Sequence, residues 1–106
     1  GNGSTDGPFI YTGFRPKYIM RKCSSNPGYG CRWEVLDTAR SPYNQANANL
    51  SPNYSNAEDS TAAYWGTDIL SNGFKLRNTD TEDNVSGQTY IYMAFAENPF
   101  KNALAR

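Results

Sequence analysis

The sequence predicts an all-β protein, and three observations predict it. Short alternating apolar runs are separated by clusters of Gly, Pro, Asn and Ser, which is typical of strands joined by turns. One run, residues 89–96, is apolar or aromatic on both faces of a strand. Of the 106 residues only 38% are hydrophobic, which suits a thin sandwich with long polar loops. We therefore expect an antiparallel β-sandwich, jelly-roll-like, with a short C-terminal helix.

The run at 89–96 is the centre of this prediction. With a period of two, Ile91, Met93 and Phe95 point to one side of the strand, while tyrosines and alanines point to the other. Its aromatic content, and the Gly and Asn-Pro that flank it, favour a strand over a short helix. Since neither side is suited to water, we expect a central strand of a sheet.

The chain length fits one domain. Residues 1–7 are rich in Gly, Asn, Ser and Asp, which predicts a linker or lead-in. Residues 8–97 hold the predicted β-sandwich domain. Asn98 followed by proline has the form of an N-cap and first helical position, so a short helix is expected in the tail, 98–106.

The charge balance and the length of the apolar runs argue against two classes of function. Lys plus Arg and Asp plus Glu both number 10, and the basic residues are scattered, so no nucleic-acid partner is expected. No apolar run approaches the roughly 20 residues that span a bilayer, so membrane insertion is not expected.

The first predicted hairpin joins strands at 17–23 and 31–37 through a turn-rich loop at 24–30. We expect Cys23 to face Cys31 across it. That register also pairs Arg21 with Trp33, Ile19 with Val35 and Lys17 with Asp37, which are a cation–π, an apolar and an ionic pair.

The two cysteines predict a disulfide, Cys23 to Cys31, across neighbouring strands, because directly facing Cβ atoms lie about 4.5–5.5 Å apart. The alternative is two reduced thiols in a small core. The chain has no His, and four ligands are usual for zinc, so no zinc site is expected.

A second hairpin is predicted at 68–77, because Asn72-Gly73 is the preferred pair for a two-residue type I′ turn. This register sets Ile69 opposite Leu76 and Asp68 opposite Arg77, with Phe74 and Leu76 on a buried face.

A long irregular segment at 38–60, with one short strand around Leu50, is the candidate binding region. Its amide side chains alternate with aromatic rings, a mixture that suits sugars or adaptable protein surfaces, and the alternative is a solvent-facing loop. The candidate ligand-binding residues, chosen by loop position and side-chain type, are Tyr29, Asn53, Tyr54, Tyr64 and Trp65.

Catalytic chemistry is not expected. The usual general base, His, is missing, and no nucleophile, phosphate-loop or metal-ligand motif occurs. Carboxylates such as Asp59 and Glu97 could serve a glycosidase, but ten acids in this length supply such pairs by chance. The acidic stretch at 80–84 lacks the spacing and glycine of a calcium loop. We therefore expect no enzyme activity, cofactor or metal.

Several segments together resemble one family, a domain of unknown function found in tailed-bacteriophage structural proteins. The similarity runs in order over nearly the whole chain. The segments that carry it are 1–7 (GNGSTDG), 13–20 (GFRPKYIM), 33–37 with Arg40 (WEVLD), 70–77 (LSNGFKLR), 86–87 (SG) and 90–101 (YIYMAFAENPFK).

The resemblance implies a virion component near the C-terminus of a large tail or fibre protein, with Gly1 a fragment boundary and Arg106 a C-terminus. It supplies no binding residues. The paired cysteines depart from the family pattern, and a disulfide would fit a particle that exists outside cells.

We expect a terminal adhesion or receptor-binding module of a phage tail or fibre that binds bacterial surface glycans. Its partners would be other virion chains in a homotrimer, and its location the extracellular virion, assembled in the bacterial cytoplasm. The alternative is a capsid decoration or fibre-assembly domain that binds only virion proteins, and a third is a fragment of a polysaccharide-degrading tailspike.

Overall fold

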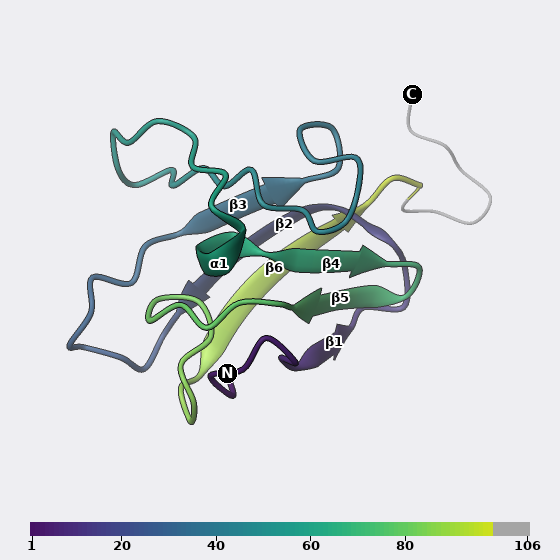
Figure 1. The fold of residues 1–106 in the computed structure, drawn as a ribbon. Coiled ribbons are helices and arrows are strands. Elements are labelled where there is room, and N and C mark those ends of the chain that lie inside the picture. The colour runs from purple at the N-terminus through teal and green to yellow at the C-terminus, as the bar shows by residue number, and fades with distance from the viewer. Residues whose placement is uncertain (99–106) are drawn as a thin grey trace.

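The computed structural model describes residues 1–98 and is mainly β (Figure 1). Two antiparallel three-stranded sheets have the strand orders β1-β5-β4 and β3-β2-β6. The prediction of a mainly β protein is confirmed, and the predicted tail helix falls on residues outside those described. The strands are β1 (Phe9–Tyr11), β2 (Pro16–Cys23), β3 (Glu34–Asp37), β4 (Thr67–Leu70), β5 (Gly73–Leu76) and β6 (Tyr90–Ala96), and one helical turn, α1, covers Ala62–Trp65.

Side chains from both sheets make the apolar core. Ile19 of β2 is fully buried and clusters with Ile69 of β4 and Phe74 of β5. The ring of Phe74 also meets Tyr92 of β6 edge-on, with centroids 5.4 Å apart. Each large apolar side chain buried in this way contributes about 1.5–3 kcal/mol, so the two sheets stabilise each other.

The prediction that Tyr90–Ala96 is a central strand is wrong. Within residues 1–98, β6 pairs only with β2 and lies at the edge of its sheet. Ile91, Met93 and Phe95 remain 48%, 52% and 53% exposed. The period-two pattern correctly predicted that Ile91, Met93 and Phe95 share one face of the strand. Nothing within the described chain covers that face. Apolar character on both sides therefore did not require burial within one chain.

The β2–β3 hairpin is present one residue out of the predicted register. Arg21 lies opposite Glu34 rather than Trp33, and Ile19 lies opposite Leu36. This register buries both Ile19 and Leu36 and places Arg21 beside an acid in the interior. Because a shift of one residue moves every side chain to the other face, burial of that apolar pair selects the observed register.

The β4–β5 hairpin also forms where predicted, with a different turn. Ile69 lies opposite Phe74 and Leu70 opposite Gly73, so Ser71 and Asn72 make the turn. Gly73 belongs to β5 and pairs with Tyr11 of β1. A Cβ at Gly73 would lie 2.0 Å from the carbonyl oxygen of Ile10, so close approach of β1 explains this glycine. Phe74 and Leu76 are buried, as predicted.

A buried charged cluster links the two sheets. The Arg21 guanidinium donates a hydrogen bond to Asp83, in the loop before β6. It donates another, 2.9 Å long, to the hydroxyl of Thr67 on β4. Glu34 of β3 lies 3.6 Å from the same guanidinium. Burial first, and then the charge of Asp83, raises the pKa of Glu34 well above its ordinary value. Asn78 donates to Asp83 as well, which holds that loop against the sheets.

The polar segments are held by local hydrogen bonds. Residues 1–7, expected as a lead-in, lie against the loop before β6, and the Gly3 amide donates to the Asn84 carbonyl at 2.7 Å. The expected strand around Leu50 is a single bridge to Val35. Over residues 1–98, no helix is long and apolar enough to cross a bilayer.

Candidate functional site

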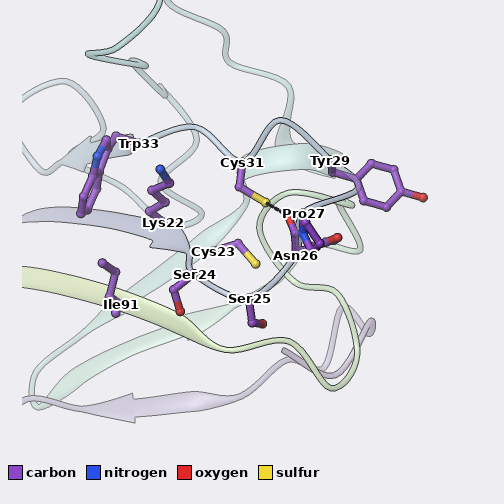
Figure 2. A pocket seen from close by; sticks show the side chains of 10 residues that line it. All are labelled: Lys22, Cys23, Ser24, Ser25, Asn26, Pro27, Tyr29, Cys31, Trp33 and Ile91. Carbon is purple, nitrogen blue, oxygen red and sulfur yellow. Dashed lines mark hydrogen bonds between the residues drawn. The ribbon is translucent and has the colours of Figure 1, made fainter.

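A groove of about 710 Å³ opens between the loop that joins β2 to β3 and the start of β6 (Figure 2). It combines two aromatic side chains with hydroxyl, amide, ammonium and thiol groups. In Figure 2, Trp33 stands at one end and Tyr29 extends from the loop at the other. The lining residues are Lys22, Cys23, Ser24, Ser25, Asn26, Pro27, Tyr29, Cys31, Trp33 and Ile91.

Hydrogen bonds to the segment before β6 fix the floor of this groove. The Ser24 amide donates to the Thr89 carbonyl at 2.9 Å, and the Thr89 amide donates to the Ser25 hydroxyl at 2.8 Å. The Ser25 hydroxyl in turn donates to Gln88 at 2.6 Å. The loop therefore leaves β2 in a direction set by β6, and Pro27 and Gly28 let it turn.

Three polar groups of the groove are available to a ligand. Within the described residues, neither the Lys22 ammonium, the Tyr29 hydroxyl nor the Asn26 amide nitrogen donates a hydrogen bond. The Lys22 ammonium lies 5.8 Å from the centroid of the Trp33 ring, and Tyr29 is 52% exposed. Aromatic surface beside free donors can hold a flat or cyclic polar molecule.

The predicted disulfide is not formed in this structure, where Cys23 and Cys31 are both free thiols. They lie close together on the groove wall (Figure 2). Burial, the adjacent Cys23 sulfur and the charge of Glu82 raise the pKa of Cys31 to about 11. For Cys23, burial acts in the same direction but is outweighed by hydrogen bonds from the Ser25 backbone and Cys31, so its pKa is lowered.

The structure separates the predicted ligand-binding residues. Only Tyr29 lines the groove. Asn53 uses its side-chain oxygen to accept from the Trp33 amide at 3.0 Å, so it supports the groove from outside. Tyr54 and Tyr64 are about half exposed, and Trp65 is 3% exposed and therefore cannot contact a ligand.

Three of these aromatic residues belong to a structural cluster around Arg32. Its guanidinium lies 5.6 Å from the Tyr54 ring and 5.4 Å from the Trp65 ring. It also makes two hydrogen bonds to Glu82, each 2.8 Å long. Tyr64 meets Trp65 edge-on at 6.2 Å. Since Arg32 directly precedes Trp33, this cluster anchors the groove wall and needs no ligand to explain it.

Sequence reasoning missed Trp33, Lys22 and Ile91 as groove residues. Trp33 was assigned to the strand face opposite Arg21, whereas it lies outside β3 in the loop. A signal was present, since a loop rich in Ser, Asn and Pro beside a Trp is typical of binding surfaces. Ile91 could not be found, because its place in the groove depends on β6 being an edge strand.

The outer face of β6, formed by Ile91, Met93 and Phe95, continues from the groove along the sheet. Register partners on β2 share this face: Lys22 beside Ile91, Met20 beside Met93 and Tyr18 beside Phe95. The Tyr18 and Phe95 rings meet edge-on at 5.8 Å. A run of half-exposed apolar side chains on one surface marks an interaction site more often than a free surface.

A smaller cavity of about 240 Å³ opens between the sheets on the opposite side of β6. Its apolar walls include Ile10, Phe74 and Tyr92, and the paired Arg21 and Asp83 also line it. The two side chains are paired with each other, but Nε of Arg21 and Oδ1 of Asp83 have no hydrogen-bond partner within the described residues.

No group of three or more metal-binding side chains occurs within residues 1–98. A family model described as a domain of unknown function (DUF7483) matches residues 1–99 of the chain. No curated protein and no solved structure matches the chain.

Proposed function

The chain belongs to the DUF7483 family of domains of unknown function, and we propose that it is a non-catalytic binding module of a bacteriophage virion protein. Its groove would attach a tail or fibre to bacterial surface glycans. The observation that carries this proposal is the groove of about 710 Å³, which sets the Trp33 and Tyr29 rings beside free polar groups.

The groove suits a sugar for chemical reasons. A pyranose has apolar C–H faces that pack on aromatic rings and a rim of hydroxyls that need hydrogen-bond partners. Trp33 and Tyr29 supply the rings, while Lys22 and Asn26 supply donors without competing partners among the described residues. The ammonium of Lys22 favours a glycan that carries carboxylate or phosphate.

The virion location rests on the resemblance of this chain to domains of tailed-bacteriophage structural proteins, which extends in order over nearly the whole sequence. A particle that acts outside the cell after assembly in the bacterial cytoplasm is the setting that this resemblance implies. The absence of His from the sequence supports a binding role rather than a catalytic one.

The finer architecture that we propose is a small sandwich, in which the two sheets pack face to face. The shared cluster of Ile19, Ile69 and Phe74 supports this arrangement, since these side chains come from β2, β4 and β5. The edge-on contact between Phe74 and Tyr92 extends the same layer to β6.

A second candidate is an assembly domain, for capsid decoration or fibre assembly, that binds only other virion chains. The exposed outer face of β6 favours it, because an apolar sheet surface suits a protein partner better than a glycan. This role would not need the free polar groups of the groove.

Glycan-array binding by the chain separates the two candidates. The adhesion role predicts binding that Trp33→Ala or Tyr29→Ala reduces at least about tenfold, whereas Tyr43→Ala, which removes an 84% exposed ring elsewhere, leaves it unchanged. Retained glycan binding in both groove variants would remove the groove from the proposal. If the chain binds no glycan on the array but binds virion proteins tightly, the assembly role would be supported instead.

A further inference from the structure

Among the described residues, the edge of β6 that faces away from β2 carries no feature that resists pairing with another strand. β6 is seven residues long and contains no charged residue, proline or glycine. The opposite edge strand of the same sheet, β3, is four residues long and carries Glu34 and Asp37. Edge strands of single-chain proteins are normally short, charged or interrupted, so β6 has the character of a strand inside a larger sheet.

The pairing with β2 determines which backbone groups of β6 are free. The Ser24 amide donates to the Thr89 carbonyl, so Thr89 faces β2. Backbone groups alternate along an antiparallel ladder, and the register from Cys23–Tyr90 to Tyr18–Phe95 is unbroken. Ile91, Met93 and Phe95 therefore direct their N–H and C=O groups to β2. The even-numbered residues, Tyr90, Tyr92, Ala94 and Ala96, direct theirs outward.

We propose that β6 pairs with β6 of a second copy of this chain, antiparallel, about a two-fold axis at Met93. This register brings outward-facing residues together on both strands, with Tyr92 opposite Ala94 and Tyr90 opposite Ala96 of the other copy. It forms about eight backbone hydrogen bonds, since each hydrogen-bonded pair exchanges two. The paired edge of β6 shares Ile91 with the groove, but the pairing itself does not rest on the proposed ligand.

The side chains of β6 complement one another in this register. On the inner side each large tyrosine meets a small alanine, so volumes match. On the outer face Ile91 meets Phe95 of the other copy, and Met93 meets Met93, so apolar groups meet apolar groups. A shift by one residue would bring inward-directed and outward-directed backbone groups together and lose the ladder.

Charge favours the antiparallel direction. Lys22 lies beside Ile91 at one end of the outer face, and the exposed Glu97 follows β6 at the other. A two-fold axis through Met93 brings unlike ends together, whereas parallel strands would bring Glu97 beside Glu97.

The area is sufficient for a weak specific dimer. Ile91, Tyr92, Met93 and Phe95 are each about half exposed. Edge pairing covers the sides of these side chains that face the other strand and leaves their outer tips exposed. That is roughly half of the exposed 100 Å² or so on each, or about 400 Å² over two copies before the backbone edge is added, an area that suits a weak, concentration-dependent dimer. This geometry gives a dimer, in contrast to the trimer that the resemblance to phage tail and fibre proteins implies.

Cysteine crosslinking tests the register directly. In a chain with Cys23→Ser and Cys31→Ser, Met93→Cys places two thiols across the axis at about 4.5–5.5 Å between Cβ atoms, and diamide oxidises them to one disulfide. We expect most of the chain to become a covalent dimer. Ile91→Cys is the matched control, because the two thiols would lie about 13 Å apart along the strands and stay uncrosslinked.

Sedimentation of the unmodified sequence supplies a second readout. We expect a concentration-dependent dimer that Phe95→Lys shifts to monomer, while Tyr11→Lys, at a 69% exposed ring on β1, leaves it intact. Equal crosslinking of Met93→Cys and Ile91→Cys, a trimer, or a monomer at every concentration would each overturn the proposal.

Discussion

Arg21 of β2 and Asp83 of the loop before β6 form an ion pair in which the side chains are 4% and 1% exposed. The same guanidinium reaches Thr67 of the other sheet. Through these contacts Arg21 joins β2 to β4 and to the loop before β6, and removing it would leave Asp83 buried without its cation.

Replacing Arg21 should destabilise the fold strongly. Arg21→Ala leaves Asp83 buried without its cation, and such a loss costs about 3–5 kcal/mol in the free energy of unfolding. Urea denaturation followed by tryptophan fluorescence measures it. Arg15→Ala removes an exposed arginine and should change the free energy by less than about 0.5 kcal/mol. Equal stability of the two variants would contradict the structural role of the cluster.

Glu34 makes stability depend on pH in an unusual direction. Its pKa is raised by burial and by Asp83, so the folded protein holds a proton that the unfolded chain releases above its ordinary pKa of 4.5. The free energy of unfolding therefore falls as pH rises from 4.5 through the raised folded-state pKa. Glu34→Gln should remove this contribution and be more stable than the unmodified sequence at pH 8. Urea titrations of Glu34→Gln and of the unmodified sequence at several pH values provide the comparison.

Gly73 should tolerate no side chain. In Gly73→Ala the new Cβ would lie 2.0 Å from the Ile10 carbonyl oxygen, so β1 must move away from β5. We expect a loss of about 2–4 kcal/mol, the size typical of severe backbone or packing conflicts. Gly28→Ala is the control, because its nearest neighbour is a side-chain oxygen at 3.6 Å. Thermal unfolding of both variants tests the difference, and a Gly73→Ala as stable as the control would refute the close approach of β1.

The two thiols should oxidise readily. The lowered pKa of Cys23 favours its thiolate, which attacks oxidised glutathione, and Cys31 then displaces the glutathione to close the Cys23–Cys31 disulfide. Mass spectrometry should show the loss of two hydrogens, and stability should rise by about 2–3 kcal/mol. Cys31→Ser should instead retain glutathione on Cys23. A protein that keeps both thiols under these conditions would exclude the disulfide.

The sequence predicted a mainly β fold and both hairpins, because alternation and turn residues act locally. It did not predict their registers. In the β4–β5 hairpin, Gly73 was assigned to the turn, whereas β1, a distant strand, requires it. In the β2–β3 hairpin, the partner of Arg21 depends on Asp83 and Thr67, which lie far along the chain.

The binding residues were harder to predict for a related reason. Tyr54 and Trp65 are side chains of a type common in ligand sites, but in the structure both rings pack against the Arg32 guanidinium. The type of a side chain does not reveal whether another residue of the same protein already occupies it, as Arg32 does here. Likewise, the composition of β6 indicated burial, whereas Ile91, Met93 and Phe95 are about half exposed within the described chain.

Amide hydrogen exchange measured by NMR at low and high protein concentration tests the pairing of β6 most directly. We expect the Ala94 and Tyr92 amides to exchange at least about tenfold more slowly at high concentration, while the Met93 amide, bonded to β2, is protected at both. Fast exchange of Ala94 and Tyr92 at every concentration, with Met93 still protected, would show that the outer edge of β6 pairs with nothing.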